Sequence, residues 1–395
     1  MFELKKAVLA VACALPLAMS GCAMAPSGSS ASSVRLAVSA NDAKVFLDNG
    51  VVRPEKNPSP DTVSIIDLRS MPPKVIAEVE APTSVSGPPL SVAVAPDESI
   101  VLVTAATKID PKDPSKVVPN NILSVIDLKA TPPRVIQTLE AGQRAAGVSI
   151  NRAGTLALVA NRGEGTVSVF SISGKSVTAA GKVKVGDEKS GPSHVVITPD
   201  GTRALVTREG DNGITLLRID GAKVEVTNRT FYAGLRPNAA DITPDGAVVV
   251  VANIGRGQGD NNTVSVIDMR ADPPRTVNTV TVGFNPEGIK LSPDGRWCAV
   301  VLTNGTNRPT SNPFYNANGK LVVLRLDGTQ LTKVAEAPIG RWSQGVAFTS
   351  DARILLVQNM VERNIQVFDF DGNTLRETHS IPLKGGGAAI RTAER

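Results

Sequence analysis

Short apolar segments separated by turn residues recur along the chain in a fixed order. The first segment of a unit is an apolar strand that runs into a turn, as in VVITPDG (195–201), and the second follows at once, as in ALVTR (204–208). Pro, Asp and Gly suit such a turn because Pro presets φ, Asp bonds its own backbone and Gly accepts a positive φ. No helical period competes with this pattern, which predicts strands throughout. The third segment closes the unit and occurs seven times, as SIIDL (64–68), SVIDL (124–128), SVFSI (168–172), TLLRI (215–219), SVIDM (265–269), VVLRL (322–326) and QVFDF (366–370).

The repeat length identifies the architecture. The turns recur about every 50 residues, which is the repeat length of a propeller blade. A further strand follows the third segment, as in PPKVIAEVEA (72–81). Four strands per unit and seven units predict an all-β, seven-bladed β-propeller with four-stranded blades.

The two ends of the repeat region are expected to complete one blade together. RLAVSAN (35–41) matches a second strand, and GGGAAIRTAER (385–395) matches a first strand that stops at its turn. Sharing a blade closes the ring and removes two free sheet edges. The alternative register makes Val34–Val38 a first strand, but it leaves the C-terminal segment unused. Residues 34–395 then form a single domain, and inserts at 42–60, 106–119 and 304–318 are expected to be loops on one rim.

The N-terminal residues predict export. Lys5 and Lys6 precede the apolar stretch Ala7–Ser20, which is too short to span a bilayer comfortably. Ser-Gly-Cys at 20–22 resembles a bacterial lipobox, which makes 1–21 a signal peptide, Cys22 the lipidation site and 22–33 a flexible tether. We expect a periplasmic protein held at the outer membrane only through lipid on Cys22. The alternative is secretion after a cut that follows residue 25.

Composition excludes several classes of protein. The chain of 395 residues is 42% apolar, which rules out wholesale disorder. The net charge is +5 without any Lys/Arg-rich run, so no nucleic-acid partner is expected. Cys13 leaves with the signal, and Cys298 lies alone in an apolar strand, where a buried small side chain is the expected role. Later segments contain no candidate transmembrane helix.

The repeat units resemble a known family. The succession of ITPDG (197–201), VVVAN (249–253) and TVSVIDM (263–269) is similar to YVTN-type propellers, within the wider group of seven-bladed bacterial lactonase-like and surface-layer propellers. The resemblance covers residues 34–395 and implies the propeller fold. It implies no single activity, because relatives include sugar-lactone hydrolases, muconate cyclases, cofactor-assembly proteins and non-enzymatic binders.

His194 is the exceptional residue of the inner strands. Six residues before each turn the chain carries small side chains, except for His194. The lactonase-like relatives use His, Arg and carboxylate groups at the channel mouth, and the resemblance assigns His194 to their inner-strand histidine. A neutral imidazole there could act as a general base, or it could simply hydrogen-bond a neighbouring blade. Arg208 in the same blade and Glu287 complete the candidate catalytic set.

Other polar residues lie on the inner strands or at their entrances. A group of arginines near one mouth could hold a carboxylate or phosphate through paired hydrogen bonds, although inter-blade ion pairs are an equal alternative. The candidate ligand-binding residues are Arg144, Arg236, Asp241, Lys290, Arg341, Trp342, Gln344 and Arg391.

Metal and cofactor chemistry is not expected. The chain has two His residues and lacks haem-attachment, zinc-helix and nucleophile-elbow motifs. Asp/Asn clusters at 209–213 and 259–263 could bind calcium, but hairpin turns are the simpler interpretation. Stacking platforms for sugars or bases are also scarce, because only two Trp and two Tyr are present.

Two hypotheses follow from these residues. The first is a monomeric, non-enzymatic envelope propeller that binds a small anionic ligand or an envelope protein. The second is a lactonase-like hydrolase or isomerase acting on a small carboxylated or sugar lactone, with His194 as general base. The second predicts that His194, Arg236 and Glu287 converge on one mouth of the channel.

Overall fold

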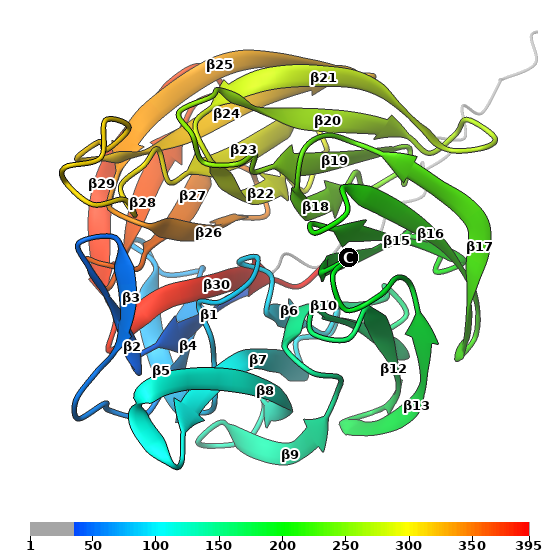
Figure 1. Cartoon of the computed structure of the whole chain (residues 1–395), viewed down its shortest axis with the longest axis horizontal. Coiled ribbons are helices and arrows are strands. Elements are labelled where there is room, and N and C mark those ends of the chain that lie inside the picture. Colours follow the sequence, from blue (N-terminus) through cyan, green and yellow to red (C-terminus); the bar gives the residue numbers. More distant parts are fainter. Residues whose placement is uncertain (1–34, 395) are drawn as a thin grey trace, which may run out of the picture. The chain divides into compact units, whose positions relative to one another are not determined.

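The blades are four-stranded antiparallel sheets arranged around a central channel (Figure 1). The computed structural model describes residues 35–394, which form one compact unit. The expected signal peptide, the tether and Cys22 lie outside the described residues. None of the described segments is a helix long and apolar enough to cross a membrane.

The strands of each blade run from the channel outward, and their bounds are as follows. Blade 1 contains β30 (Gly386–Thr392), β1 (Leu36–Asp42), β4 (Thr62–Asp67) and β5 (Lys74–Glu80); blade 2 contains β6 (Val92–Val94), β7 (Ile100–Asp110), β8 (Asp113–Asp127) and β9 (Arg134–Glu140). Blade 3 contains β10 (Ala145–Ile150), β11 (Leu156–Asn161), β12 (Thr166–Ser173) and β13 (Ser176–Lys184); blade 4 contains β14 (Pro192–Ile197), β15 (Arg203–Arg208), β16 (Gly213–Asp220) and β17 (Lys223–Tyr232). Blade 5 contains β18 (Pro237–Ile242), β19 (Val248–Asn253), β20 (Asn262–Asp268) and β21 (Arg275–Gly283); blade 6 contains β22 (Pro286–Leu291), β23 (Trp297–Leu302), β24 (Gly319–Asp327) and β25 (Gln330–Ile339). Blade 7 contains β26 (Ser343–Phe348), β27 (Ile354–Asn359), β28 (Asn364–Phe370) and β29 (Leu375–Pro382).

Blade 1 joins the two ends of the described chain. Strand β30 pairs with β1, with Ala37 opposite Thr392 and Ala40 opposite Ala389. The other edge of β1 pairs with β4, so β1 is a second strand and β30 is the first. This confirms the predicted closure and excludes the alternative register. Figure 1 shows the two strands side by side at the channel.

Apolar side chains fill the spaces between neighbouring blades. One such cluster joins Val63 and Ile65 of blade 1 to Val101 and Val103 of blade 2, so the core is a ring of sheet-on-sheet contacts rather than one centre. The inner strand β26 is buried on both faces, whereas the outermost strand β21 alternates exposed and half-buried residues. Cys298 is fully buried in such a cluster, and burial raises the pKa of its thiol. Its packing is that of a small apolar side chain, as expected.

The predicted turns form at the end of each inner strand, on what we call the turn face. In blade 4, Thr198 Oγ1 donates to Asp200 Oδ1 over 2.5 Å, and the same oxygen accepts the backbone N–H of Thr202. Gly201 follows with φ +71°. Because these hydrogen bonds are local, the Thr-Pro-Asp-Gly sequence by itself predicts where the inner strand ends.

The three inserts lie at the opposite end of the ring, which we call the upper mouth. Residues of all three line one cavity there, which confirms a common rim. The expectation of loops was wrong for two of them: 42–60 contains the hairpin of β2 (Val45–Asp48) and β3 (Val51–Pro54), and 106–119 extends β7 and β8. β-branched residues such as Val51, Val52 and Val117 favour strands in these segments. The insert 304–318 contains no strand.

Candidate active site at the upper mouth

A cavity of about 480 Å³ opens at the upper mouth, within the range typical of small-molecule sites. Its charged lining consists of Asp42, Arg144, Arg162, Arg236, Glu209 and Glu287. Its apolar lining consists of Val45, Val52, Val85, Val117, Ile254 and Trp342. The site therefore combines charged and apolar groups. We call the three arginines, with Glu209 and Glu287, the charged floor.

A repeated backbone conformation directs several of these side chains. The residue just before the inner strand is left-handed in blades 3 to 7. Its φ is +56° at Arg144, +57° at Arg236 and +47° at Trp342, and Gly191 and Asn285 hold the same position in blades 4 and 6. This conformation costs an L-residue about 1–2 kcal/mol, and such strain is typical of functional sites. The side chains of Arg144, Arg236 and Trp342 all line the cavity.

Glu209 ties two of the arginines together. Its Oε2 lies 2.7 Å from Arg162 Nη2, and its Oε1 is paired with Arg236 Nη2. Arg162 also donates from Nη1 to Ser193 Oγ over 2.5 Å. Burial alone would raise the pKa of Glu209, but the charges of Arg162 and Arg236 lower it below its usual range. Glu209 is therefore a permanent anion that fixes two guanidinium groups in place.

Arg144 has a different environment. Among residues 35–394, no carboxylate pairs with its guanidinium. Partial burial, and after it the charge of Arg162, lowers the pKa of Arg144, but a guanidinium remains charged at neutral pH. Asp42, another carboxyl of the lining, pairs with Lys44 at 3.0 Å. The three arginines therefore face Glu209 and Glu287, which leaves an excess of positive charge that attracts anions.

Glu287 is a carboxyl group that can change its charge near neutrality. Its Oε1 accepts a hydrogen bond from Asn285 Nδ2 over 3.3 Å, and its Oε2 accepts one from Asn238 Nδ2 over 3.4 Å. Burial, and after it the negative charge of Glu209, raises the pKa of Glu287 to about 7. A carboxyl with this pKa can accept and return a proton at physiological pH.

The structure brings together five of the residues predicted from the sequence. Arg144, Arg236, Glu287, Trp342 and Gln344 all line the upper cavity. The Gln344 side chain is held by its Nε2, which donates to the carbonyl of Trp342 over 3.3 Å. Their roles toward a ligand remain predictions.

His194 belongs to a second group of residues, here called the lower channel cluster, with Asp241, Lys290, Arg391 and Glu394. Lys290 Nζ lies 3.0 Å from Asp241 Oδ2 and 3.0 Å from Glu394 Oε1. His194 is 4% exposed, and its Nε2 lies 3.3 Å from Ser149 Oγ. Burial, and after it the charge of Arg391, lowers the pKa of His194 well below its usual value.

The expected convergence on one mouth is therefore only partial. Arg236 and Glu287 line the upper cavity, whereas His194 does not. Arg208 lies away from the cavity as well: its Nη1 donates to the carbonyl of Val185 over 2.5 Å, and its Nε lies 3.2 Å from Asp211. Arg341 pairs with Glu362 at 2.8 Å on the rim. The repeat alignment showed which strand or turn carries each of these residues. It did not show in which direction each side chain points.

Three charged site residues were missed from the sequence, namely Asp42, Arg162 and Glu209. Arg162 and Glu209 directly follow the second strand of their blades, and the equivalent residues Asp42 and Ile254 also line the cavity. Reading that column across the repeats would have found all four. Asn238 was not chosen either, although it occupies the same repeat position on its inner strand as Glu287 and Gln344.

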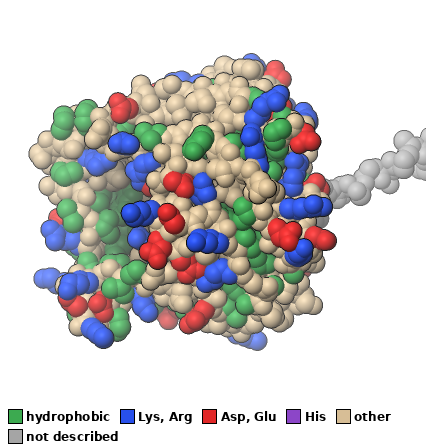
Figure 2. All heavy atoms as spheres, turned by 45° about the vertical axis from the view of Figure 1, so that its right-hand side comes forward, with side chains coloured by type: hydrophobic (Ala, Val, Ile, Leu, Met, Phe, Trp, Pro, Cys, Tyr) green, Lys and Arg blue, Asp and Glu red, His purple; other side chains and the backbone are tan. Residues whose placement is uncertain are grey.

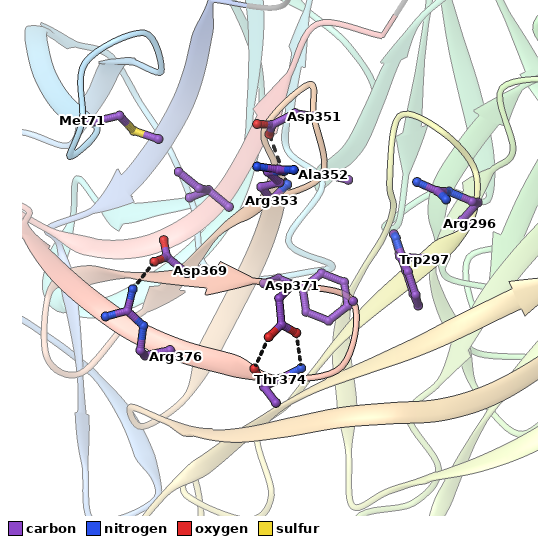
Figure 3. Close-up of a pocket in the computed structure, with 13 residues that line it drawn as sticks. Met71, Arg296, Trp297, Asp351, Ala352, Arg353, Asp369, Asp371, Thr374 and Arg376 are labelled. Atoms are coloured by element: carbon purple, nitrogen blue, oxygen red, sulfur yellow. Dashed lines mark hydrogen bonds and ion pairs between the residues drawn. The ribbon is translucent and has the colours of Figure 1, made fainter.

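A larger cavity of about 1020 Å³ lies between the turn of blade 6 and the outer strands of blade 7 (Figure 3). Trp297 and Phe370 meet edge to face there, with ring centroids 5.1 Å apart. Its carboxylates are engaged locally: Asp369 pairs with Arg376, and Asp371 accepts hydrogen bonds from Thr374. We place the candidate site in the smaller cavity, because most of its charged groups are less exposed and because it contains Glu287, whose pKa is raised to about 7.

Figure 2 shows Lys/Arg and Asp/Glu side chains interspersed over one side of the molecule rather than gathered by sign. Within residues 35–394, no group of three or more His, Cys, Asp or Glu side chains is arranged to hold a metal ion.

Comparisons with known proteins agree with this architecture. The family described as Lactonase, 7-bladed beta-propeller, matches residues 123–234 and 186–310. The periplasmic gluconolactonase of Pseudomonas aeruginosa superposes with a TM-score of 0.67 at 17% identity, over 91% of this chain and 99% of that one. A candidate 6-phosphogluconolactonase of Bacteroides fragilis gives 0.68 at 17% identity, over 93% and 99% of the two chains.

More distant functions share the fold. The hydrazine synthase of Kuenenia stuttgartiensis superposes with a TM-score of 0.59 at 17% identity, over 83% of this chain and 95% of that one. No curated protein matches the sequence significantly. At these identities the solved structures establish the fold alone, and the YVTN label remains a prediction. The chain is thus a seven-bladed β-propeller in which residues 123–310 match the Lactonase, 7-bladed beta-propeller, family.

Proposed function

We propose that the upper cavity hydrolyses a small lactone, with Glu287 as general base and the arginines as the anion-binding groups. The observation that carries the proposal is a carboxyl with a pKa of about 7 in a cavity that contains three arginines. Perturbed carboxyls in such clefts are typical of acid–base catalysts. The family match and the fold shared with the Pseudomonas gluconolactonase support the same reaction class.

The chemistry requires no other group. Ionised Glu287 takes a proton from water as the water oxygen bonds to the lactone carbonyl carbon. The carbonyl oxygen becomes an oxyanion, which a guanidinium stabilises. When the ring C–O bond breaks, protonated Glu287 returns its proton to the leaving alkoxide. The product is a hydroxy acid whose new carboxylate remains compatible with the charged floor.

This assignment moves the base from His194 to Glu287. His194 does not line the cavity, and its Nε2 already faces Ser149. Burial keeps its imidazole neutral, which suits a residue that joins two inner strands. We assign stabilisation of the oxyanion to Arg144. Its guanidinium forms no ion pair among the described residues, so it can bind a ligand oxygen without first breaking one.

The test is turnover of purified protein against a panel of sugar, muconate and alkyl lactones, followed by hydroxy-acid release. Glu287→Gln should lower kcat by about 10²–10⁴-fold, as expected for loss of a general base. Glu362→Gln is the matched control, because Glu362 pairs with Arg341 on the rim outside the cavity. His194→Ala should retain turnover. Equal rates for wild type and Glu287→Gln would refute the proposal.

A binding module is the second candidate function. The observation that favours it is the excess of positive charge on the floor, which suffices to hold a small anion without chemistry. Anion binding that is lost in Arg144→Met, with no turnover of any lactone, would support this function instead.

We further propose that the protein works in the cell envelope as a lipoprotein. The support is the Ser-Gly-Cys sequence at 20–22 behind an apolar segment. Cys22→Ala should abolish labelling by radioactive palmitate and release the protein from the membrane fraction. Unchanged labelling in this variant would overturn the proposal.

A further inference from the structure

Two of the inserts present apolar side chains to the upper cavity. Val52 of β3 and Val117 of β8 line the cavity and remain 46% and 36% exposed. Below them, Val45 and Val85 pack against Trp342. We call Val52 and Val117 the apolar roof of the cavity, because they line it on the solvent side and remain exposed to water.

The apolar roof is held in place by its neighbours. Asn49 Oδ1, in the β2–β3 turn, accepts the backbone N–H of Thr310 over 2.8 Å. Gly50 has φ +85°, and a Cβ there would lie 2.5 Å from the Pro309 ring, so the turn fits closely against the insert 304–318. Strand β3 also contacts β8. The valines are thus positioned before any ligand arrives, which lowers the entropic cost of binding.

The floor and the roof require different chemistry from one ligand. Arg144 attracts an anionic or carbonyl oxygen, whereas the valines gain from removing apolar surface from water. A polyhydroxylated ring would bring hydroxyl groups against the valines, where they lose hydrogen bonds to water that only the polar rim residues Thr107 and Asn307 could replace. An alkyl substituent would bury the valines with no such loss.

We propose that this site takes an amphiphilic carboxylate or its lactone, with the oxygen-rich head on the charged floor and an alkyl substituent under Val52 and Val117. The inference rests on the proposed function for the reaction, but its ligand class can be measured by binding alone. This ligand class differs from the polyhydroxylated rings that a sugar-lactone site binds. Each methylene under the roof should tighten binding about three- to fourfold.

The first experiment measures affinity against chain length. The chain has two tryptophans, so Trp297→Phe leaves Trp342 in the cavity as the sole tryptophan reporter. Titrations with straight-chain carboxylates from acetate to octanoate should show the Kd falling with length, and gluconate should bind no more tightly than acetate. Calorimetry provides an independent readout. A Kd that does not change with chain length, or gluconate binding as tightly as octanoate, overturns the inference.

The second experiment uses matched variants of the roof. Val52→Thr combined with Val117→Thr keeps the side-chain shape and adds hydroxyls, and it should weaken octanoate at least tenfold with little effect on acetate. Val51→Thr is the control, because Val51 is 49% exposed on the same strand but does not line the cavity. If the double variant instead changes only the self-association measured by sedimentation, the roof is an interface between copies and the inference fails.

Turnover separates this inference from the proposed function. Alkyl-substituted γ-lactones should be preferred over glucono-lactone in kcat/KM, and the preference should shrink in the double variant. Chain-length-dependent binding without any turnover would leave the ligand class standing and refute the lactonase. Turnover that favours glucono-lactone would leave the lactonase standing and refute the ligand class.

Discussion

The upper cavity and the lower channel cluster are built on the same inner strands, yet their charges are arranged differently. In the lower channel cluster, Lys290 contacts both Asp241 and Glu394. In the upper cavity, Glu209 is shared by two arginines and Arg144 has no carboxylate partner among the described residues.

Arg391 of the lower channel cluster also lacks an ion pair among the described residues, and its buried Nη1 has no hydrogen-bond partner, so an unpaired arginine does not by itself distinguish the two regions. The upper cavity differs because it combines open volume with Glu287, whose pKa is raised to about 7. A titratable carboxyl in a cavity is typical of a ligand site.

Breaking the lower channel cluster should reduce stability rather than activity. Lys290→Met leaves Asp241 almost fully buried and without its cation, and such a change typically costs about 3–5 kcal/mol. Denaturant unfolding measures this loss, while kcat/KM of the folded variant should match wild type. Lys333→Met is the control, because its pair with Glu336 is exposed and contributes about 0–1 kcal/mol. A large loss of activity without a loss of stability would place catalysis in the lower channel.

Removing the unpaired cation of the upper cavity should have the opposite effect. Arg144→Met is expected to lower kcat/KM about 100-fold, as for loss of one oxyanion donor. Stability should hardly change, because no ion pair among residues 35–394 is broken. Lactone turnover and thermal unfolding of the same preparation measure both effects. A destabilised variant with unchanged kcat/KM would contradict the comparison.

Glu287 should make the fold less stable as the pH rises. Its pKa is about 7 in the folded protein against about 4.3 when unfolded, so protonation favours the native state. That stabilisation is complete below the unfolded pKa and is lost as the pH rises through about 7. Glu287→Gln mimics the protonated form and should be more stable than wild type by about 3–4 kcal/mol at pH 8. Thermal unfolding between pH 4 and pH 8 should show the difference vanish at the acidic end.

The same ionisation should shape the rate. Because only ionised Glu287 can accept a proton, kcat/KM should rise about tenfold from pH 6 to pH 8 around its pKa of about 7. His194 should contribute nothing to this rise, because burial holds its pKa well below that range. The profile of His194→Ala therefore provides the control. A profile that loses its rise in His194→Ala, and not in Glu362→Gln, would return the role of base to His194.

The blades could be predicted because their signals are local. The Thr-Pro-Asp-Gly turn closes through contacts two residues apart, such as Thr198 to Asp200, and period-two apolar patterns determine which face is buried. Even the shared blade was predictable, since each terminal segment matches one column of the repeat. The hairpin in 42–60 was missed because this insert lies outside the repeat. No equivalent segment in another blade was available to show that it forms strands.

The site was harder to predict because its contacts cross between blades. Arg144 and Arg236 were found by their place before the inner strands, but Glu209 was not, and it organises the arginines. Its partner Arg162 lies in another blade, 47 positions away in the chain. The repeat pattern of the sequence shows which positions are equivalent in different blades. It does not give the distance between two side chains that belong to different blades.

The amino-acid sequence by itself determined the strand order, the turns and the number of blades, because these depend on neighbours within one unit. Only the tertiary structure decided which charges would be neutralised. Ring closure brings Glu394 to Lys290, 104 positions apart, while Arg144 at the other end of the channel meets no carboxylate. Ion pairing depends on separations of a few ångströms, and these exist only once the seven blades have closed.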